Sequence, residues 1–373
     1  MEAQDIFNGE RWAHVLSVLP RDLDESVRAT GCVERFRNVR SAGDLLRVML
    51  AYGVSDLSLK DTAAWAKADG IAEFTAPALF YRVEQSHIWL RHILGQLLLE
   101  RRSVDEAALQ IRIVDATVIT GPGSKGTDWV LHTVIDPVAG CFESVEITNA
   151  KAGETFLRHS VHPDQLVLGD RQYGTARGIE FVVNHGAHPV VRVNRRTLKI
   201  CDLERRRIYL QSFEPDLPKG NLISMDVLIP TPPNMTGTKN KAWDLKDATS
   251  WIPARMVGCR TDKDVTWVLT TASRDMLSDE ALMNLYRLRW QIELLFKRLK
   301  SLLHLDALPS RDGPTSKSWL LIRLLVAAIA QILVGPSGVF PPRRHRGARV
   351  NGKPQRMVSI SGKPVGAPNS DPR

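Results

Sequence analysis

Three acidic residues, far apart in the sequence, have surroundings that suit metal-dependent chemistry. Asp115 ends an alternating run, Asp170 ends a short apolar run, and Glu293 lies within a helical pattern. Carboxylates that converge on one point can hold two Mg²⁺ ions, and two such ions support in-line phosphoryl displacement. A single Asp at a strand end is more often a turn former, so this interpretation depends on the three acids occurring in this order.

The predicted helix around Glu293 carries a polar stripe. We expect one continuous helix from residue 278 to about residue 303, with acids in its first turn and bases near its end. At 100° per residue, a stripe about 80° wide holds five polar side chains: Tyr286, Arg289, Glu293, Lys297 and Lys300. The alternative is a solvated salt-bridge face, because Arg289–Glu293 and Glu293–Lys297 are i,i+4 pairs.

The elements that would position the first two acids are mostly strands. Turn-forming residues separate three successive runs of strand character, which predicts an antiparallel arrangement. A short apolar strand, a helix and two more strands follow. The predicted strands cover residues 109–115, 129–136, 142–148, 165–170, 189–194 and 266–271, and the helix covers 176–185. Residues from about 195 to about 265, with β-like runs at 207–210 and 255–259, are predicted to be a β-rich insertion.

The first hundred residues are predicted to be helical. Residues 1 to about 105 contain no convincing alternating strand. Ser58 and Thr75 are predicted to cap two short helices on either side of the turn at Asp69-Gly70. Such a pair fits a helix-turn-helix, which would place Arg82 near DNA, and the alternative is an ordinary helical bundle.

The residues that carry the candidate chemistry resemble a known family. Tyr286-x2-Arg289-x3-Glu293-x6-Lys300 reproduces the Y-R-E-K signature of transposases of the insertion sequence 4 family. Val114-Asp115-Ala-Thr117 is similar to the family's first-acid segment, and Leu168-Gly-Asp170-Arg171-Gln-Tyr173-Gly174 is similar to its second. Trp129-x2-His132 also fits. The resemblance runs from about residue 40 to about residue 326.

The resemblance implies an α/β fold and a role for each matched residue. The fold would be an RNase H-like catalytic domain with a β-rich insertion, preceded by an all-helical DNA-binding domain. Asp115, Asp170 and Glu293 would ligate two Mg²⁺ or Mn²⁺ ions. The DNA contacts would be Tyr286, Arg289, Lys300, Arg171, Arg192, Lys125, His132, Trp267 and Lys297. Trp267 would stand against a base flipped out of the DNA end, with core packing as the alternative. For Arg171 and Arg192 the alternative is pairing with buried carboxylates.

The predicted organisation ends in a basic tail. We expect a DNA-binding domain at 1–105, a catalytic domain at 106–310, a helix at 311–334 and a disordered tail at 335–373. The tail holds eight Lys or Arg and one acid, so it carries +7 of the formal net charge of +9. The basic charge is therefore weak support for nucleic-acid binding by the folded body. We expect a frameshift or truncation to have replaced a C-terminal helical region here, and the alternative is a basic arm that binds duplex DNA.

Nothing in the sequence predicts a membrane or secretory protein. No apolar run reaches the roughly 18–20 residues of a membrane span, and the N-terminus lacks a basic-then-apolar signal. The four cysteines have no paired metal-ligand spacing and are predicted to be free thiols. We therefore expect a cytoplasmic protein.

The predicted function is DNA transposition. A phosphodiester at the element end would be hydrolysed, and the freed 3′-OH would attack target DNA. The partner is double-stranded DNA, and a homodimer is expected on paired ends. Two alternatives use the same residues: a nuclease of the same fold that cuts without strand transfer, and a DNA-binding descendant that binds ends without cleavage. Retention of the three acids favours catalysis.

Overall fold

The fold is described from a computed structural model. The described residues are 9–55, 57–99, 110–139, 141–212, 214, 220–233, 243–260, 265–290, 293, 296–297, 300–301, 308 and 313–334. The predicted disordered tail at 335–373 lies outside them.

The chain forms two compact units, which we describe separately. The first contains residues 1–159 and 288–345, and the second contains residues 160–287 and 346–373. The predicted catalytic domain at 106–310 thus has described parts in both units, and the boundaries of the predicted domains stay predictions.

The N-terminal part of the first unit is helical, as predicted. Ser58 and Thr75 cap their helices, because their side chains accept hydrogen bonds from the N–H groups of Asp61 and Ala78 at 3.2 and 3.3 Å. Gly70, in the turn between these helices, has φ +67°, a conformation that glycine adopts without strain. The described helices are α2 (Gly9–Ser17), α3 (Leu23–Ala29), α4 (Ala42–Val54), α5 (Leu59–Ala68), α6 (Ala76–Gln85) and α7 (His87–Leu99).

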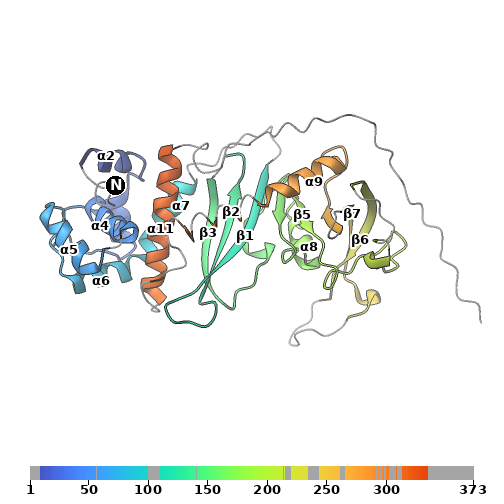
Figure 1. The fold of residues 1–373 in the computed structure, drawn as a ribbon, viewed down its shortest axis with the longest axis horizontal. Coiled ribbons are helices and arrows are strands. Elements are labelled where there is room, and N and C mark those ends of the chain that lie inside the picture. Colours follow the sequence, from blue (N-terminus) through green and yellow to red (C-terminus); the bar gives the residue numbers. More distant parts are fainter. Residues whose placement is uncertain are drawn as a thin grey trace, which may run out of the picture. The chain divides into compact units, whose positions relative to one another are not determined.

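A long apolar helix, α11 (Gly313–Val334), is the core of the first unit. It packs against α4, α6, α7 and strand β3, and Figure 1 shows it between α4 and β3. Among the described helices it alone is long and apolar enough to cross a membrane, yet 67% of its most apolar window is buried within the protein. A helix was predicted at 311–334, and the structure has one at Gly313–Val334 that is largely buried.

The sheet of the first unit has three antiparallel strands, β1 (Ile111–Ile119), β2 (Trp129–Asp136) and β3 (Cys141–Asn149). The predicted antiparallel arrangement is confirmed. The predicted end of the first strand at Asp115 is wrong, because Asp115 pairs with Thr133 and the ladder continues to Ile119. The β-branched residues Thr117, Val118 and Ile119 extend the strand toward Gly121.

A buried ion cluster joins these three strands. The Arg112 guanidinium contacts Asp136 on β2 at 3.1 Å and also pairs with Glu143 on β3. A β-bulge where Val134 and Ile135 face β3 leaves Glu143 outside the paired register. The bulge therefore supplies the second carboxylate that Arg112 needs when it is buried.

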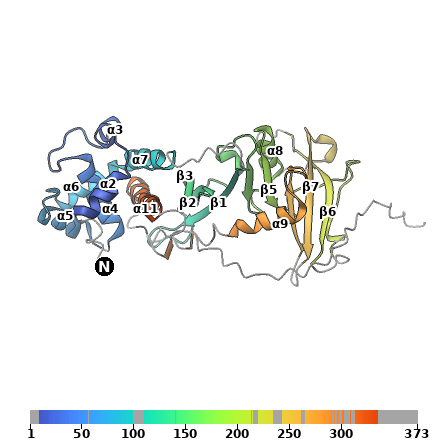
Figure 2. The ribbon, with the colours of Figure 1, turned by 90° about the horizontal axis from the view of Figure 1, so that it is seen from above.

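The second unit contains a five-stranded sheet in the order β4-β5-β8-β7-β6. β4 and β5 are parallel, and the other pairs are antiparallel. Figure 2 shows α8 and α9 on opposite sides of this sheet. The elements are β4 (Leu166–Gly169), α8 (Ala176–Asn184), β5 (His188–Arg192), β6 (Leu222–Pro230), β7 (Trp251–Arg260), β8 (Val265–Thr270) and α9 (Asp279–Leu288).

The predicted insertion is β-rich only in part. Its strand at 255–259 is confirmed as part of β7, and β6 is a further strand. The β-like run at 207–210 is not a strand, because it makes only an isolated bridge between Cys201 and Arg207 and then enters a 3-10 turn at Leu210–Ser212. Here the local pattern is overridden by tertiary context.

The predicted continuous helix from 278 to 303 is wrong at one position. α9 ends at Leu288, and Arg289 is a turn residue. Helix resumes at Trp290, and the described residues from there to Ser301 are helical. Neither Pro nor Gly marks the break, so the sequence contains no usual sign of it.

The close packing of α4 on α11 can be tested with two helical glycines. A methyl group on Gly53 would overlap Ile322 of α11, whereas one on Gly95 of α7 would meet nothing within 4 Å. Gly53→Ala is expected to lower the free energy of unfolding by about 1–3 kcal/mol through overpacking. Gly95→Ala is expected to raise it by about 0.5–1 kcal/mol, since alanine favours helix. Urea denaturation of both variants tests the assignment, and a shift of the same sign in both would contradict it.

Candidate active site

Asp115 lies near the centre of β1 and is 9% exposed. Its Oδ1 atom accepts a hydrogen bond from the main-chain N–H of Ala116 at 2.9 Å. Residues directly opposite in a sheet share a face, so Asp115 shares one face with Thr133 and Ala116 shares the other with His132. The strand therefore holds Oδ1 of Asp115 and directs the side chain to one face of the sheet.

Asp170 directly follows β4, as predicted. Its Oδ1 atom accepts hydrogen bonds from the N–H groups of Gln172 and Tyr173 at 2.6 and 3.4 Å. Its other oxygen, Oδ2, has no hydrogen-bond partner among the described residues. Gly174 lets this loop approach β5, because a Cβ there would lie 3.0 Å from the Arg192 carbonyl oxygen. The loop thus fixes one carboxylate oxygen and leaves the other for a ligand.

Glu293 lies on the helical segment after the break at Arg289. Arg289 donates a hydrogen bond to Glu293 Oε1 at 2.6 Å, so the ion pair of the salt-bridge alternative is present. Further along, Lys300 Nζ donates to the main-chain oxygen of Val118 at 3.1 Å. Val118 is on β1, three residues beyond Asp115. Within the first unit, this bond joins the segment of Glu293 to the strand of Asp115.

The three acids do not form a described cluster. In the part of the chain that the structure describes, no three His, Cys, Asp or Glu side chains gather as a metal site. Asp115 and Glu293 belong to the first unit and Asp170 to the second. The three-acid assignment therefore stays a prediction, supported so far by the link between the first and third acids.

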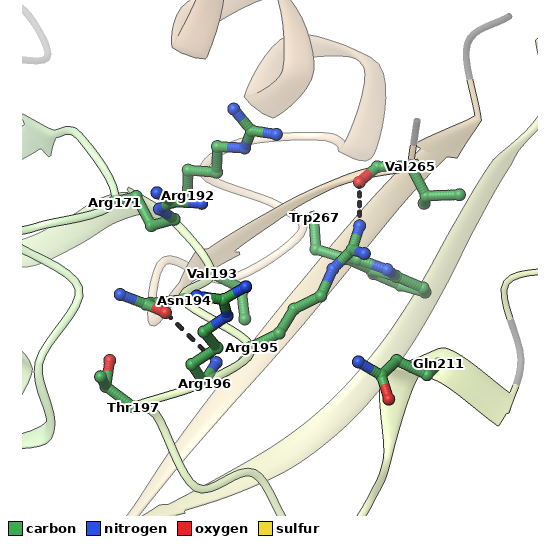
Figure 3. Close-up of a pocket in the computed structure, with 10 residues that line it drawn as sticks. All are labelled: Arg171, Arg192, Val193, Asn194, Arg195, Arg196, Thr197, Gln211, Val265 and Trp267. Atoms are coloured by element: carbon green, nitrogen blue, oxygen red, sulfur yellow. Dashed lines mark hydrogen bonds between the residues drawn. The ribbon is translucent and has the colours of Figure 1, made fainter. Parts of the chain in front are cut away.

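A basic pocket of about 470 Å³ lies in the second unit, next to Asp170. The Arg195 guanidinium crosses it to reach the Val265 carbonyl and also pairs with Glu214 at 3.0 Å (Figure 3). The lining residues are Arg171, Arg192, Val193, Asn194, Arg195, Arg196, Thr197, Gln211, Val265 and Trp267. Four arginines against few acids make this pocket suited to an anion.

Trp267 occupies a core position. It is 1% exposed, and its indole N–H donates to Glu214 at 3.1 Å. Its ring covers Gly258 so closely that a Cβ there would lie 2.6 Å from the ring. Core packing, the alternative given for Trp267, is what the structure shows, and a base contact would require the ring to leave this position.

His132 points away from the face of Asp115 and is 1% exposed. Its Nε2 lies 2.9 Å from Thr148 Oγ1. Burial lowers the pKa of His132, Arg158 lowers it further, and Glu146 opposes the shift. Burial, with His132 and Arg158 nearby, lowers the pKa of His159 to about 4. The structure thus places His132 in a buried, neutral histidine pair rather than beside the first acid.

The other predicted DNA contacts are accessible. Arg171, Lys125 and Lys297 are exposed, and Arg192, Tyr286, Arg289 and Lys300 are partly exposed. Arg195 and Arg196 of the basic pocket were not predicted as site residues. The signal was an Arg-Arg pair two residues after Val193, close to the strand that adjoins the second acid's strand.

Three comparisons with known proteins found similar sequences and a similar structure. Residues 106–329 match the family described as Transposase DDE domain. InsL, named for insertion sequence element IS186A of Escherichia coli (strain K12), is 30% identical over 371 residues, covering 90% of this chain and 97% of that protein. The transposase for insertion sequence element IS421 of Escherichia coli is 30% identical over 372 residues, with the same coverage. The piggyBac transposase synaptic complex with hairpin DNA has a TM-score of 0.44 at 8% identity, covering 88% of this chain and 73% of that chain.

These matches define an enzyme of DNA transposition, which cleaves DNA and transfers strands with divalent metal ions. The chain belongs to the Transposase DDE domain family. The predicted function and enzyme class are confirmed, and the identity of the insertion-sequence family within this class stays a prediction.

The buried histidine pair predicts how stability depends on pH. Because the pKa of His159 falls from 6.5 to about 4 on folding, the folded state binds fewer protons than the unfolded state between these values. The contribution of His159 to the free energy of unfolding should therefore be fully present above about pH 6.5. It should be lost toward pH 4, by at most about 1.4 kcal/mol per pH unit. Thermal unfolding between pH 7.5 and 4.5 measures the slope. His159→Phe should flatten it and the exposed His14→Gln should not; equal slopes in all three proteins would contradict the assignment.

Proposed function

We propose that Asp115, Asp170 and Glu293 are the metal ligands of this transposase and hold two Mg²⁺ or Mn²⁺ ions. The donor set fits, because hard divalent cations prefer carboxylate oxygens and Asp170 keeps Oδ2 without a partner among the described residues. When bound, the ions would activate an attacking hydroxyl and stabilise charge on the leaving oxygen.

The hydrogen bond from Lys300 to the Val118 carbonyl carries this proposal. Val118 is three residues from Asp115, about 10 Å along a strand. Lys300 is seven residues from Glu293, about 10 Å along a helix. The bond therefore holds the helical segment of Glu293 against β1, and Glu293 and Asp115 lie at similar distances along their elements from it. Asp170 would complete the site from the end of β4.

The remaining site residues would bind the DNA backbone. Tyr286, Arg289, Lys297 and Lys300 would contact phosphates of the transposon end, and Arg171, Arg192 and Lys125 would extend that contact. Arg289 holds Glu293 through its ion pair until a phosphate competes for the guanidinium. His132 and Trp267 are buried, so they would reach DNA only after a local rearrangement.

The arrangement of strands and helices within each unit also supports this proposal. The antiparallel β1, β2 and β3 in the first unit and the parallel pair of β4 and β5 in the second support an RNase H-like catalytic domain. The capped helices α5 and α6 on either side of Gly70 support a helix-turn-helix for end binding. We also propose that the protein acts in the cytoplasm and binds paired transposon ends as a homodimer.

The acid assignment is tested by nicking of a labelled duplex that carries the element's terminal repeat, with Mg²⁺ or Mn²⁺. Asp115→Asn, Asp170→Asn and Glu293→Gln should each reduce nicking by roughly a thousandfold, since the metal ions supply several kcal/mol of transition-state stabilisation. Binding of the repeat should persist. The exposed Asp275→Asn serves as the matched control. Nicking that survives any of the three substitutions would remove that residue from the site, and joining to a second DNA separates a transposase from a nuclease.

The structural role of Lys300 is tested against Lys297, which has no hydrogen bond among the described residues. Lys300→Met should lower the nicking rate even at saturating DNA, because the segment of Glu293 loses its bond to β1. Lys297→Met should weaken DNA binding by a few-fold and recover its rate at saturation. Nicking rates measured against DNA concentration separate the two effects. If Lys300→Met also recovered fully at saturation, the bond would not position the acid.

A further inference from the structure

The second unit has a basic and aromatic strip in which only Arg171 has a role in the active-site assignment. The basic pocket adjoins a smaller hollow of about 60 Å³, because Arg195 and Gln211 line both. Arg171 and Arg196 are on the pocket side, and Arg207 and Tyr209 are on the other side. We call Arg171, Arg196, Arg207 and Tyr209 the arginine–tyrosine strip.

The three arginines of this strip are not neutralised within the described part of the chain. None of them has an acidic partner there. Two other exposed arginines of the same unit, Arg206 and Arg274, do have such partners. Arg206 binds Asp202 and Glu204 at 2.7 and 2.8 Å, and Arg274 binds Asp226 at 2.9 Å. The strip thus carries positive charge that no described carboxylate balances, as expected of a surface that binds a polyanion.

Tyr209 adds an aromatic face to the strip. Its side chain is 68% exposed, and the Arg207 guanidinium lies 5.8 Å from the ring centroid. The hollow beside it has an apolar floor of Leu198, Ile200, Ile208 and Leu210. An exposed ring beside a cation and an apolar floor can stack on an unpaired nucleobase. A base inside a duplex is already stacked on its neighbours and has no free face for the ring. Trp267 cannot serve in this way where it stands, because it is buried.

We propose that the arginine–tyrosine strip binds an unpaired single-stranded segment of DNA that leads away from the cleavage point. Arg171 directly follows Asp170, so the strip begins beside the second acid. The arginines bind successive phosphates, and Tyr209 stacks a base. The direction of this segment rests on the proposed function, because a cleaved end whose strands separate supplies an unpaired strand.

The test uses the full chain without metal, so that no cleavage occurs. Fluorescence anisotropy compares a labelled thymidine oligonucleotide with a blunt duplex of the same length. Tyr209→Ala should weaken single-strand binding by about 5- to 100-fold and leave duplex binding nearly unchanged. Tyr209→Phe keeps the ring and should retain single-strand binding. Leu203→Ala, on the same segment and 64% exposed, is the matched control and should change neither.

The arginines are tested through salt dependence. Arg196→Gln with Arg207→Gln should reduce the slope of log affinity against log salt by about 0.7 per arginine for the single strand. An unchanged slope, or equal losses for Tyr209→Phe and Tyr209→Ala, would overturn the proposal. So would equal losses for single strand and duplex. The oligonucleotide assay contains no metal and measures no cleavage, so a failure of the acid assignment in the nicking assay is separable from a failure here.

Discussion

The register of β1 against β2 determines what the first carboxylate can reach. Side chains alternate between faces of a sheet, so a slip of one residue would move Asp115 to the face of His132 and bring Ala116 in its place. The buried pairing of Arg112 with Asp136 and Glu143 opposes such a slip, because it would leave a guanidinium and two carboxylates buried and unpaired. The proposed site therefore depends on an ion cluster that is separate from the three proposed metal ligands.

The position of β1 also affects Glu293, the third proposed metal ligand. Lys300 bonds to the main-chain oxygen of Val118, so its position depends on where β1 runs rather than on any one side chain of that strand. Glu293 is held by Arg289, at the break between two helical segments. A main-chain bond at one end and an ion pair at the other fix the carboxylate more firmly than either contact alone.

The sequence predicted the elements whose signals are local. The capping hydroxyls of Ser58 and Thr75 bond where they were expected, and β2 has its predicted bounds. The centre of β1 was mistaken for its end, because an Asp is more often a turn former than a strand residue. The break at Arg289 could not be predicted, since neither Pro nor Gly marks it. The basic pocket combines the local pair Arg195-Arg196 with distant segments, and no local pattern shows that these segments meet.

The aromatic residues show why residue type alone does not predict which side chains bind DNA. Trp267 is in the position that the family resemblance assigns to a flipped base, yet Gly258 beneath it and Glu214 at its N–H make it part of the core. Freeing its ring would cost the buried area and leave Glu214 without that bond. Tyr209 meets no such cost, because it is already exposed beside Arg207. For an unpaired base, the accessible ring has the advantage over the larger but buried one.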